Sequence, residues 1–155
     1  MEVAAVTGYK PPRDVWQLCE SAVNMIPLTV DKMHTLLGTP MVEDPRTPGR
    51  WEAGPTKLAR SLAVTSSVIA IRDGTWLFAA INIEPPPCIS VEMVKAFYPT
   101  VEFRYGPAGH SIYETFGWEV RHDWGVLRFG IRVQDDCLAT IALEPAAAAQ
   151  PDNLV

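Results

Sequence analysis

The residues best suited to nucleophilic or metal chemistry are three cysteines and three histidines. They are Cys19, Cys88, Cys137, His34, His110 and His122. Cys19 with His34 could form a thiolate nucleophile activated by a base, and His110 with His122 and a carboxylate could bind a metal. Any chain with three residues of each type offers such pairs. The sequence shows no Cys-x-x-Cys, His-Glu-x-x-His, glycine-rich phosphate loop or Gly-x-Ser-x-Gly.

Two carboxylates occupy matching positions, because Glu84 and Glu144 each precede a proline. Paired carboxylates can hydrolyse glycosides, but a Glu-Pro step at a strand end predicts a solvated terminus. His122-Asp123 is more typical of a residue pair that shapes a turn. We therefore predict a protein that is not an enzyme, with no catalytic residue, no metal and no cofactor.

The amino-acid composition limits the classes of binding partner that we expect. The chain has 13 basic and 18 acidic residues, a net charge of −5, and no run of Lys or Arg. Phosphate recognition needs clustered cations, so nucleic acid is not expected, and a basic protein partner is favoured. No apolar stretch reaches the roughly 20 residues of a membrane helix. The location expected from the chain as written is cytoplasmic, or periplasmic if a signal peptide was removed. The oligomeric state stays open.

Apolar spacing and capping residues predict three helices, at 13–25, 30–37 and 91–98, with Asp14, Thr29 and Ser90 as caps. Strands are expected at 62–72 and 75–84, which flank the hairpin signal Asp73-Gly74. Further strands are expected at 101–105, 112–121, 126–133 and 137–144. The Pro- and Gly-rich segment 40–57 predicts a loop with a short edge strand around Trp51.

An odd number of cysteines leaves at least one of them free or paired with another chain. Cys19 and Cys88 each lie near the start of an expected helix, so a bridge between them is conceivable. The alternative is three reduced, mostly buried thiols.

The two hairpins resemble each other, since Ile71-Arg72 recurs as Ile131-Arg132 and Glu84-Pro85 as Glu144-Pro145. The order of cap, short helix, strands and hairpin also recurs. We therefore predict an α+β fold in which two tandem helix–β-strand repeats, at about 13–85 and 88–145, form one antiparallel sheet with helices on one face. They make a single domain, 1–145, followed by a flexible tail, 146–155.

Alternation along the strands predicts an open sheet face opposite the helices. It places Leu77, Ala79, Ile81 and Ile83 towards the core, and Trp76, Phe78 and Asn82 on the open face with Arg128, Arg132 and Thr140. Strand 112–121 adds either Glu119 and Arg121 or Trp118 and Val120, because its register is open. Trp124, at a turn tip, is expected to be exposed.

Trp, Tyr and Arg carry much of the binding energy at protein interfaces. The predicted partner-binding residues are Trp76, Phe78, Trp118, Arg121, Trp124 and Arg128. The alternative is that the loop 40–57 covers Trp76 and Phe78.

One segment resembles a known family. Residues 29–40 (TVDKMHTLLGTP), followed by Trp51 and a hairpin, resemble the signature of SmpA/OmlA-type outer-membrane lipoproteins. Two such units in tandem are similar to the β-lactamase-inhibitory-protein architecture. The resemblance covers residues 29–84, and the second unit has Tyr98-Pro99 where the signature has Leu-Gly-x-Pro.

The resemblance implies a non-enzymatic binder: an enzyme inhibitor, an immunity protein or an envelope-assembly subunit. Our first hypothesis is an inhibitor or immunity protein that neutralises a bacterial toxin or enzyme by direct binding. The alternative is a cell-envelope assembly or scaffold subunit of SmpA/OmlA type.

Overall fold

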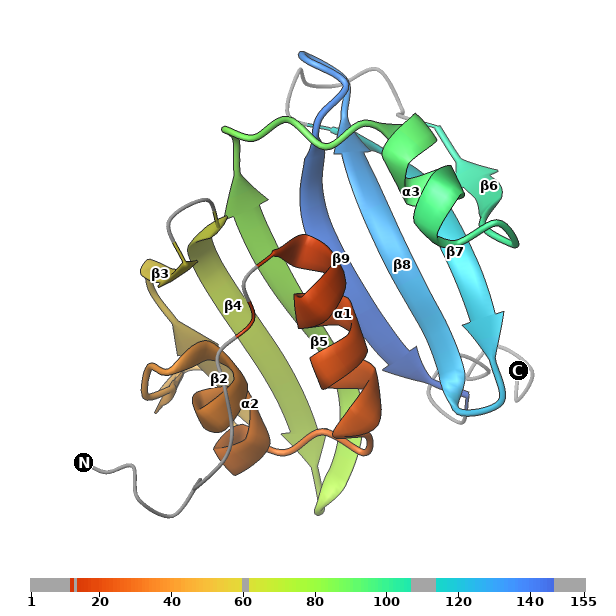
Figure 1. The fold of residues 1–155 in the computed structure, drawn as a ribbon. Helices are drawn as coiled ribbons and strands as arrows, with labels where there is room; N and C mark the ends of the chain where they lie inside the picture. Colours follow the sequence, from red (N-terminus) through yellow and green to blue (C-terminus); the bar gives the residue numbers. More distant parts are fainter. Residues whose placement is uncertain (1–11, 13, 60–61, 107–113, 147–155) are drawn as a thin grey trace.

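A computed structural model describes residues 12, 14–59, 62–106 and 114–146 (Figure 1). A nine-stranded antiparallel sheet dominates it, with the strand order β1-β2-β4-β5-β9-β8-β7-β6 and β3 paired to β4. The strands are β1 (Val42–Glu43), β2 (Arg50–Ala53), β3 (Thr56–Ala59), β4 (Leu62–Arg72), β5 (Thr75–Glu84), β6 (Glu102–Tyr105), β7 (Thr115–His122), β8 (Gly125–Arg132) and β9 (Leu138–Pro145). The helices are α1 (Val15–Asn24), α2 (Val30–Leu37) and α3 (Val91–Phe97), and all lie on one side of the sheet (Figure 1).

The prediction of two tandem helix–strand repeats is wrong. Among the described residues, two helices and five strands precede Pro85, whereas one helix of seven residues and four strands follow it. The fold is rich in sheet rather than built from equivalent units. The similarity between the two hairpins has a simpler physical cause, because any hairpin that buries one face repeats β-branched residues at alternate positions.

The three short helices begin where the capping residues predict. Asp14 Oδ1 accepts a hydrogen bond from the Gln17 amide at 2.8 Å, and Thr29 Oγ1 accepts one from Lys32 at 3.1 Å. The Ser90 hydroxyl accepts one from Met93 at 3.3 Å. Helices of seven to ten residues are marginal by themselves. Their stability therefore depends on burying one side against the sheet.

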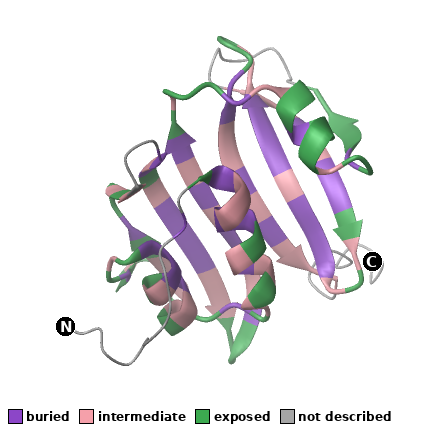
Figure 2. Cartoon of the chain, in the orientation of Figure 1, coloured by how far each residue is buried: buried purple, intermediate pink, exposed green. Residues whose placement is uncertain are grey.

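The hydrophobic core lies between the helices and the sheet. Leu18 and Met33 from α1 and α2 are fully buried, as are Ile81, Phe129 and Ile141 from the sheet. Figure 2 shows this buried band along the middle strands, beneath the helices. Core residues on β5, β8 and β9 pair with one another across the strands, for example Ile81 with Ile141 and Ile141 with Phe129.

β-bulges change which side of the sheet a residue faces. Ala70 pairs with Phe78 but Ile71 pairs with Trp76, so Leu77 is an extra residue in β5. An extra residue shifts the alternation of all residues beyond it. Trp76 therefore faces the helices, together with Ile71, while Phe78 faces away from them.

A disulfide joins Cys88 to Cys137, and the Cα atoms of the two residues are 4.9 Å apart. Cys19 is free and buried in α1. Both interpretations of the cysteines are therefore wrong: Cys88 pairs with the start of β9 and not with α1. Burial raises the pKa of the Cys19 thiol to about 12, so this cysteine packs as a small apolar residue.

We predict that breaking the disulfide lowers stability. It closes a loop with a sequence separation of 49 residues, and restricting such a loop in the unfolded chain stabilises the fold by about 4 kcal/mol. Urea denaturation with and without reductant should show this loss. The Cys88→Ala/Cys137→Ala variant is the control, because reductant should not change its midpoint. Equal midpoints for the oxidised and reduced wild type would contradict the prediction.

A second prediction concerns Ser67. This residue is 3% exposed and faces the core from β4, and its Oγ has no hydrogen-bond partner in the described structure. Because an unsatisfied buried hydroxyl costs free energy, Ser67→Ala should raise the free energy of unfolding by about 1 kcal/mol. Ser66→Ala is the matched control. It removes the hydroxyl that accepts a hydrogen bond from Asn82, so it should lower stability.

Candidate functional site

The side of the sheet opposite the helices presents an ordered surface, which we call the helix-free face. No helix among the described residues lies on it (Figure 1). Strand register places one row of side chains on this face across eight strands. In order from β1 to β6 the row is Val42, Glu52, Val68, Ala80, Ala142, Arg128, Glu119 and Glu102. Small residues occupy the middle of the row. Arg128, Glu119 and Glu102 lie together towards the β6 end, and Glu52 lies near the β1 end.

A second row beside it is polar and internally hydrogen-bonded. Asn82 links two neighbouring strands, because its Nδ2 donates to Ser66 Oγ at 2.9 Å and its Oδ1 accepts from Thr140 Oγ1 at 2.9 Å. The row continues across the sheet through Gly130 and Gly117. These hydrogen bonds orient the polar groups before any ligand binds. The two glycines have no side chain, so no side chain projects from the sheet at these positions.

Gly117 provides the space for an aromatic ring. A Cβ atom at this position would lie 2.3 Å from ring carbons of Tyr105, so the ring lies directly over the backbone of β7. Tyr105 itself is 44% exposed. The sequence analysis did not select Tyr105. A glycine inside a strand can mark a close approach by another group, and this was the available signal.

The most developed feature of the helix-free face is an ion cluster around Glu119, whose side chain is 6% exposed. Arg128 Nε donates a hydrogen bond to Glu119 Oε2 at 2.9 Å. Its Nη2 lies 2.7 Å from the same oxygen, and its Nη1 lies 2.6 Å from Glu144 Oε1. Partial burial acts to lower the pKa of Arg128, but the bond to Glu119 and the charge of Glu144 outweigh it and raise the pKa. Arg128 therefore keeps both its charge and its orientation.

Two further arginines surround the same carboxylate at longer range. Arg104 Nε is 3.7 Å and Arg121 Nη2 is 4.0 Å from Glu119 Oε1. Their side chains are 60% and 65% exposed. Glu119 is already bound by Arg128, so these two guanidinium groups are weakly held and available to a ligand.

Glu84 and Glu144 do not form a catalytic carboxylate pair. Glu144 binds Arg128, whereas Glu84 lies 3.6 Å from Arg132. Both glutamates at these strand ends are therefore in ion pairs with arginines of β8, which is the neighbour of β9 but not of β5. No group of three His, Cys, Asp or Glu residues in the described ranges could hold a metal. His110 lies outside those ranges.

The structure divides the six predicted partner-binding residues between the two sides of the sheet. Phe78, Arg121 and Arg128 lie on the helix-free face. Trp118 does not, because it pairs with the core residue Phe129. The open register of this strand is thereby decided in favour of Glu119 and Arg121.

The other two tryptophans also lie on the helix side. Trp76 is 5% exposed and lines a pocket of about 320 Å³ beside Leu28 and Val30, at the start of α2. Trp124 is not an exposed tip: its ring stacks on His122 with centroids 5.1 Å apart and lies 6.5 Å from Trp76. Neither ring belongs to the helix-free face. For Trp76 the cause is the bulge at Leu77, which turns this side chain towards the helices.

We predict that Glu119→Gln destabilises the fold by about 1–3 kcal/mol. The substitution leaves a partly buried guanidinium with a neutral partner. Arg121→Ala is the control, because its exposed pair at 4.0 Å should contribute less than about 0.5 kcal/mol. Chemical denaturation at neutral pH measures both. Equal losses for the two variants would show that the cluster contributes no more than surface charges do.

In the described residues, no helix combines the length and apolar character needed to cross a membrane. Comparisons of the chain with protein-family models, with curated proteins and with solved structures returned no match. The resemblance of residues 29–84 to SmpA/OmlA-type lipoproteins therefore stays a prediction, and the function has to be argued from the helix-free face itself.

Proposed function

We propose that this protein is a non-enzymatic binding module, an inhibitor or immunity protein that neutralises a bacterial toxin or enzyme by docking the helix-free face onto it. The observation that carries the proposal is the Arg128–Glu119–Glu144 cluster. It lies beside Ala142 and Ala80, two residues of the same row that we call the small-residue floor. Small side chains allow another protein surface to approach closely. The oriented arginine beside them supplies directional contacts.

The rigidity of the face supports a binding role. Association costs free energy when interface side chains lose rotamer freedom. Here Asn82 and Arg128 are already held by neighbouring strands, so little of that freedom remains to be lost. Arginine and aromatic residues are enriched among the residues that dominate interface energies, and Phe78, Arg121 and Tyr105 lie on the same face as the small residues.

The disulfide indicates the kind of compartment in which the protein would meet its partner. Structural disulfides persist mainly in oxidising compartments, so the Cys88–Cys137 bridge favours a location outside the cytoplasm. An envelope-assembly or scaffold subunit would also fit such a location. The two functions differ in one measurable respect, because only an inhibitor abolishes the activity of its partner.

The test places a large side chain on the small-residue floor. Ala142→Arg places a long side chain beside Ala80 and should weaken partner binding about a hundredfold, as expected for a clash at the centre of an interface. Asn24→Arg adds the same charge to the exposed end of α1 and should leave binding unchanged. Arg121→Glu, at an exposed position, is a second variant of the face that does not depend on packing.

The partner is first captured from a native extract with the wild type and identified, and it is then purified. Its enzymatic or toxic activity is measured against increasing amounts of each variant, after thermal melts confirm folding. Inhibition by the wild type and Asn24→Arg, but not by Ala142→Arg, supports the proposal. A partner that binds and keeps full activity would indicate a scaffold instead. Inhibition insensitive to both variants of the face would rule out this surface.

A further inference from the structure

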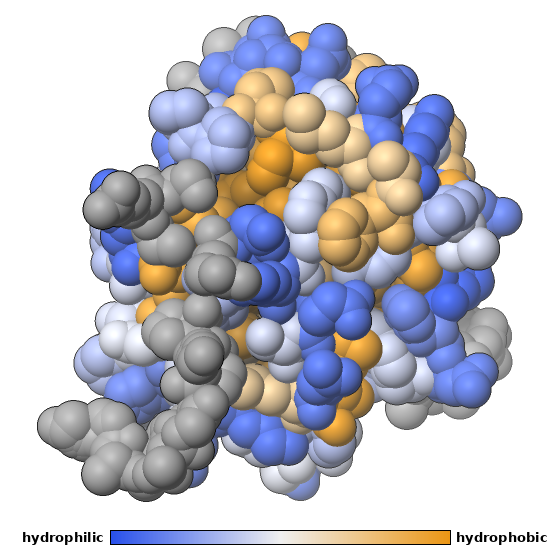
Figure 3. Space-filling model, in the orientation of Figure 1, coloured by the Kyte–Doolittle hydropathy of each residue, from blue (hydrophilic) through white to orange (hydrophobic). Residues whose placement is uncertain are grey.

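The helix side of the molecule carries a second surface with different chemistry. Met93 and Phe97 on α3 are 52% and 50% exposed, although both are large apolar residues. They are four positions apart, so they occupy the same side of the helix. Trp16 of α1 stacks on Phe97, with ring centroids 4.6 Å apart and planes at 9°. We call Trp16, Met93 and Phe97 the Trp16–Phe97 patch. Figure 3 shows apolar surface over α3 and in the gap towards α1.

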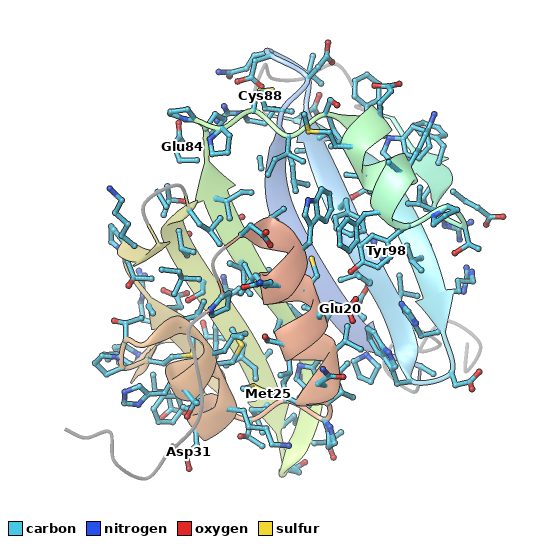
Figure 4. All side chains as sticks on the ribbon, viewed as in Figure 1. Glu20, Met25, Asp31, Glu84, Cys88 and Tyr98 are labelled. Carbon is cyan, nitrogen blue, oxygen red and sulfur yellow. A yellow bond between two sulfur atoms is a disulfide. The ribbon has the colours of Figure 1, made fainter. Side chains whose placement is uncertain are left out.

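The patch rests on an ordered support. The Tyr98 ring lies 6.3 Å from Trp16 and 5.5 Å from the fully buried Phe129. Its hydroxyl donates to Glu20 Oε2 of α1 at 3.1 Å, and the two side chains meet between the helices (Figure 4). The exposed rings are therefore attached to the core through Tyr98 and held in place.

Among the residues that the structure describes, the charges that border the patch are negative. Asp14 and Glu20 on or beside α1, and Glu92 on α3, are all exposed, and α1 contains no Lys or Arg. The one cation of α3, Lys95, lies 4.8 Å over the Trp118 ring, on the other flank of the helix. An apolar surface bordered by carboxylates complements an apolar surface bordered by cations.

We propose that the Trp16–Phe97 patch docks a basic amphipathic helix of a partner protein. Met93 and Phe97 are spaced by one helical turn, which matches apolar anchors spaced by three or four residues on a facing helix. Lysines or arginines flanking those anchors would meet Asp14, Glu20 and Glu92. An anionic membrane is a poor alternative, because these carboxylates would be repelled by its headgroups. The patch lies on the opposite side of the sheet from the helix-free face and so adds a second contact.

The test uses two fluorescein-labelled peptides, each about 15 residues long, with the same leucine pattern. One carries lysines and the other glutamates at the polar positions. Fluorescence anisotropy should show that the full chain binds the Leu/Lys peptide with micromolar affinity and does not bind the Leu/Glu peptide. Phe97→Ser should weaken binding of the Leu/Lys peptide at least tenfold. Phe103→Ser is the matched control, because Phe103 is 53% exposed but meets the Trp118 ring edge-on, and it should change binding less than twofold.

Glu92→Lys tests the charges without altering an aromatic contact, and should both weaken binding and reduce its dependence on salt. Ala142→Arg should have no effect, so failure of this proposal is distinguishable from failure of the proposed function. Vesicles of phosphatidylglycerol are the remaining probe. No binding of the Leu/Lys peptide, equal losses for Phe97→Ser and Phe103→Ser, or vesicle binding that requires Phe97 would overturn the proposal.

Discussion

The pairing of β5 with β9 is the interaction on which the rest of the structure depends. Residues 79–82 of β5 pair with residues 140–143 of β9, and this contact joins β4–β5 to β8–β9 in one sheet. It places Ile81 against Ile141 on the core side and Ala80 against Ala142 on the other. Both the hydrophobic core and the small-residue floor of the helix-free face therefore exist only because these two strands meet.

The two sides of the sheet have different physical roles. On the helix side, short helices that could not persist alone bury fully apolar positions and leave the Trp16–Phe97 patch at the surface. On the helix-free face, hydrogen bonds and ion pairs between side chains satisfy the polar groups. The charge of Glu119 is tolerated at only 6% exposure because arginines surround it. Buried charges persist only where partners are supplied. The partners come from three different strands, β6, β7 and β8, so the sheet must form before the cluster can.

The charged residues of this acidic protein are arranged differently on the two sides of the sheet. On the helix-free face, Arg50, Arg128 and Arg132 are paired with Glu52, with Glu119 and Glu144, and with Glu84. On the helix side, the exposed carboxylates Asp14, Glu20 and Glu92 lie at α1 and α3 and contribute to the net charge of −5. Long-range attraction of a basic partner and short-range recognition would then use different parts of the molecule.

Local sequence signals determined the helices, their caps and the Asp73-Gly74 hairpin, because capping and turn residues act within a few positions. They also placed Phe78 and Arg128 on one face, whereas the face of Arg121 stayed open until the pairing of β7 with β8 decided it. Only the tertiary structure decided that the two halves of the sheet are not equivalent repeats, that Cys88 bonds Cys137, and that Trp76 and Trp118 face the helices. Each of these depends on strand register, on a bulge, or on contacts between distant residues. A single inserted residue reverses a face without changing the residue pattern.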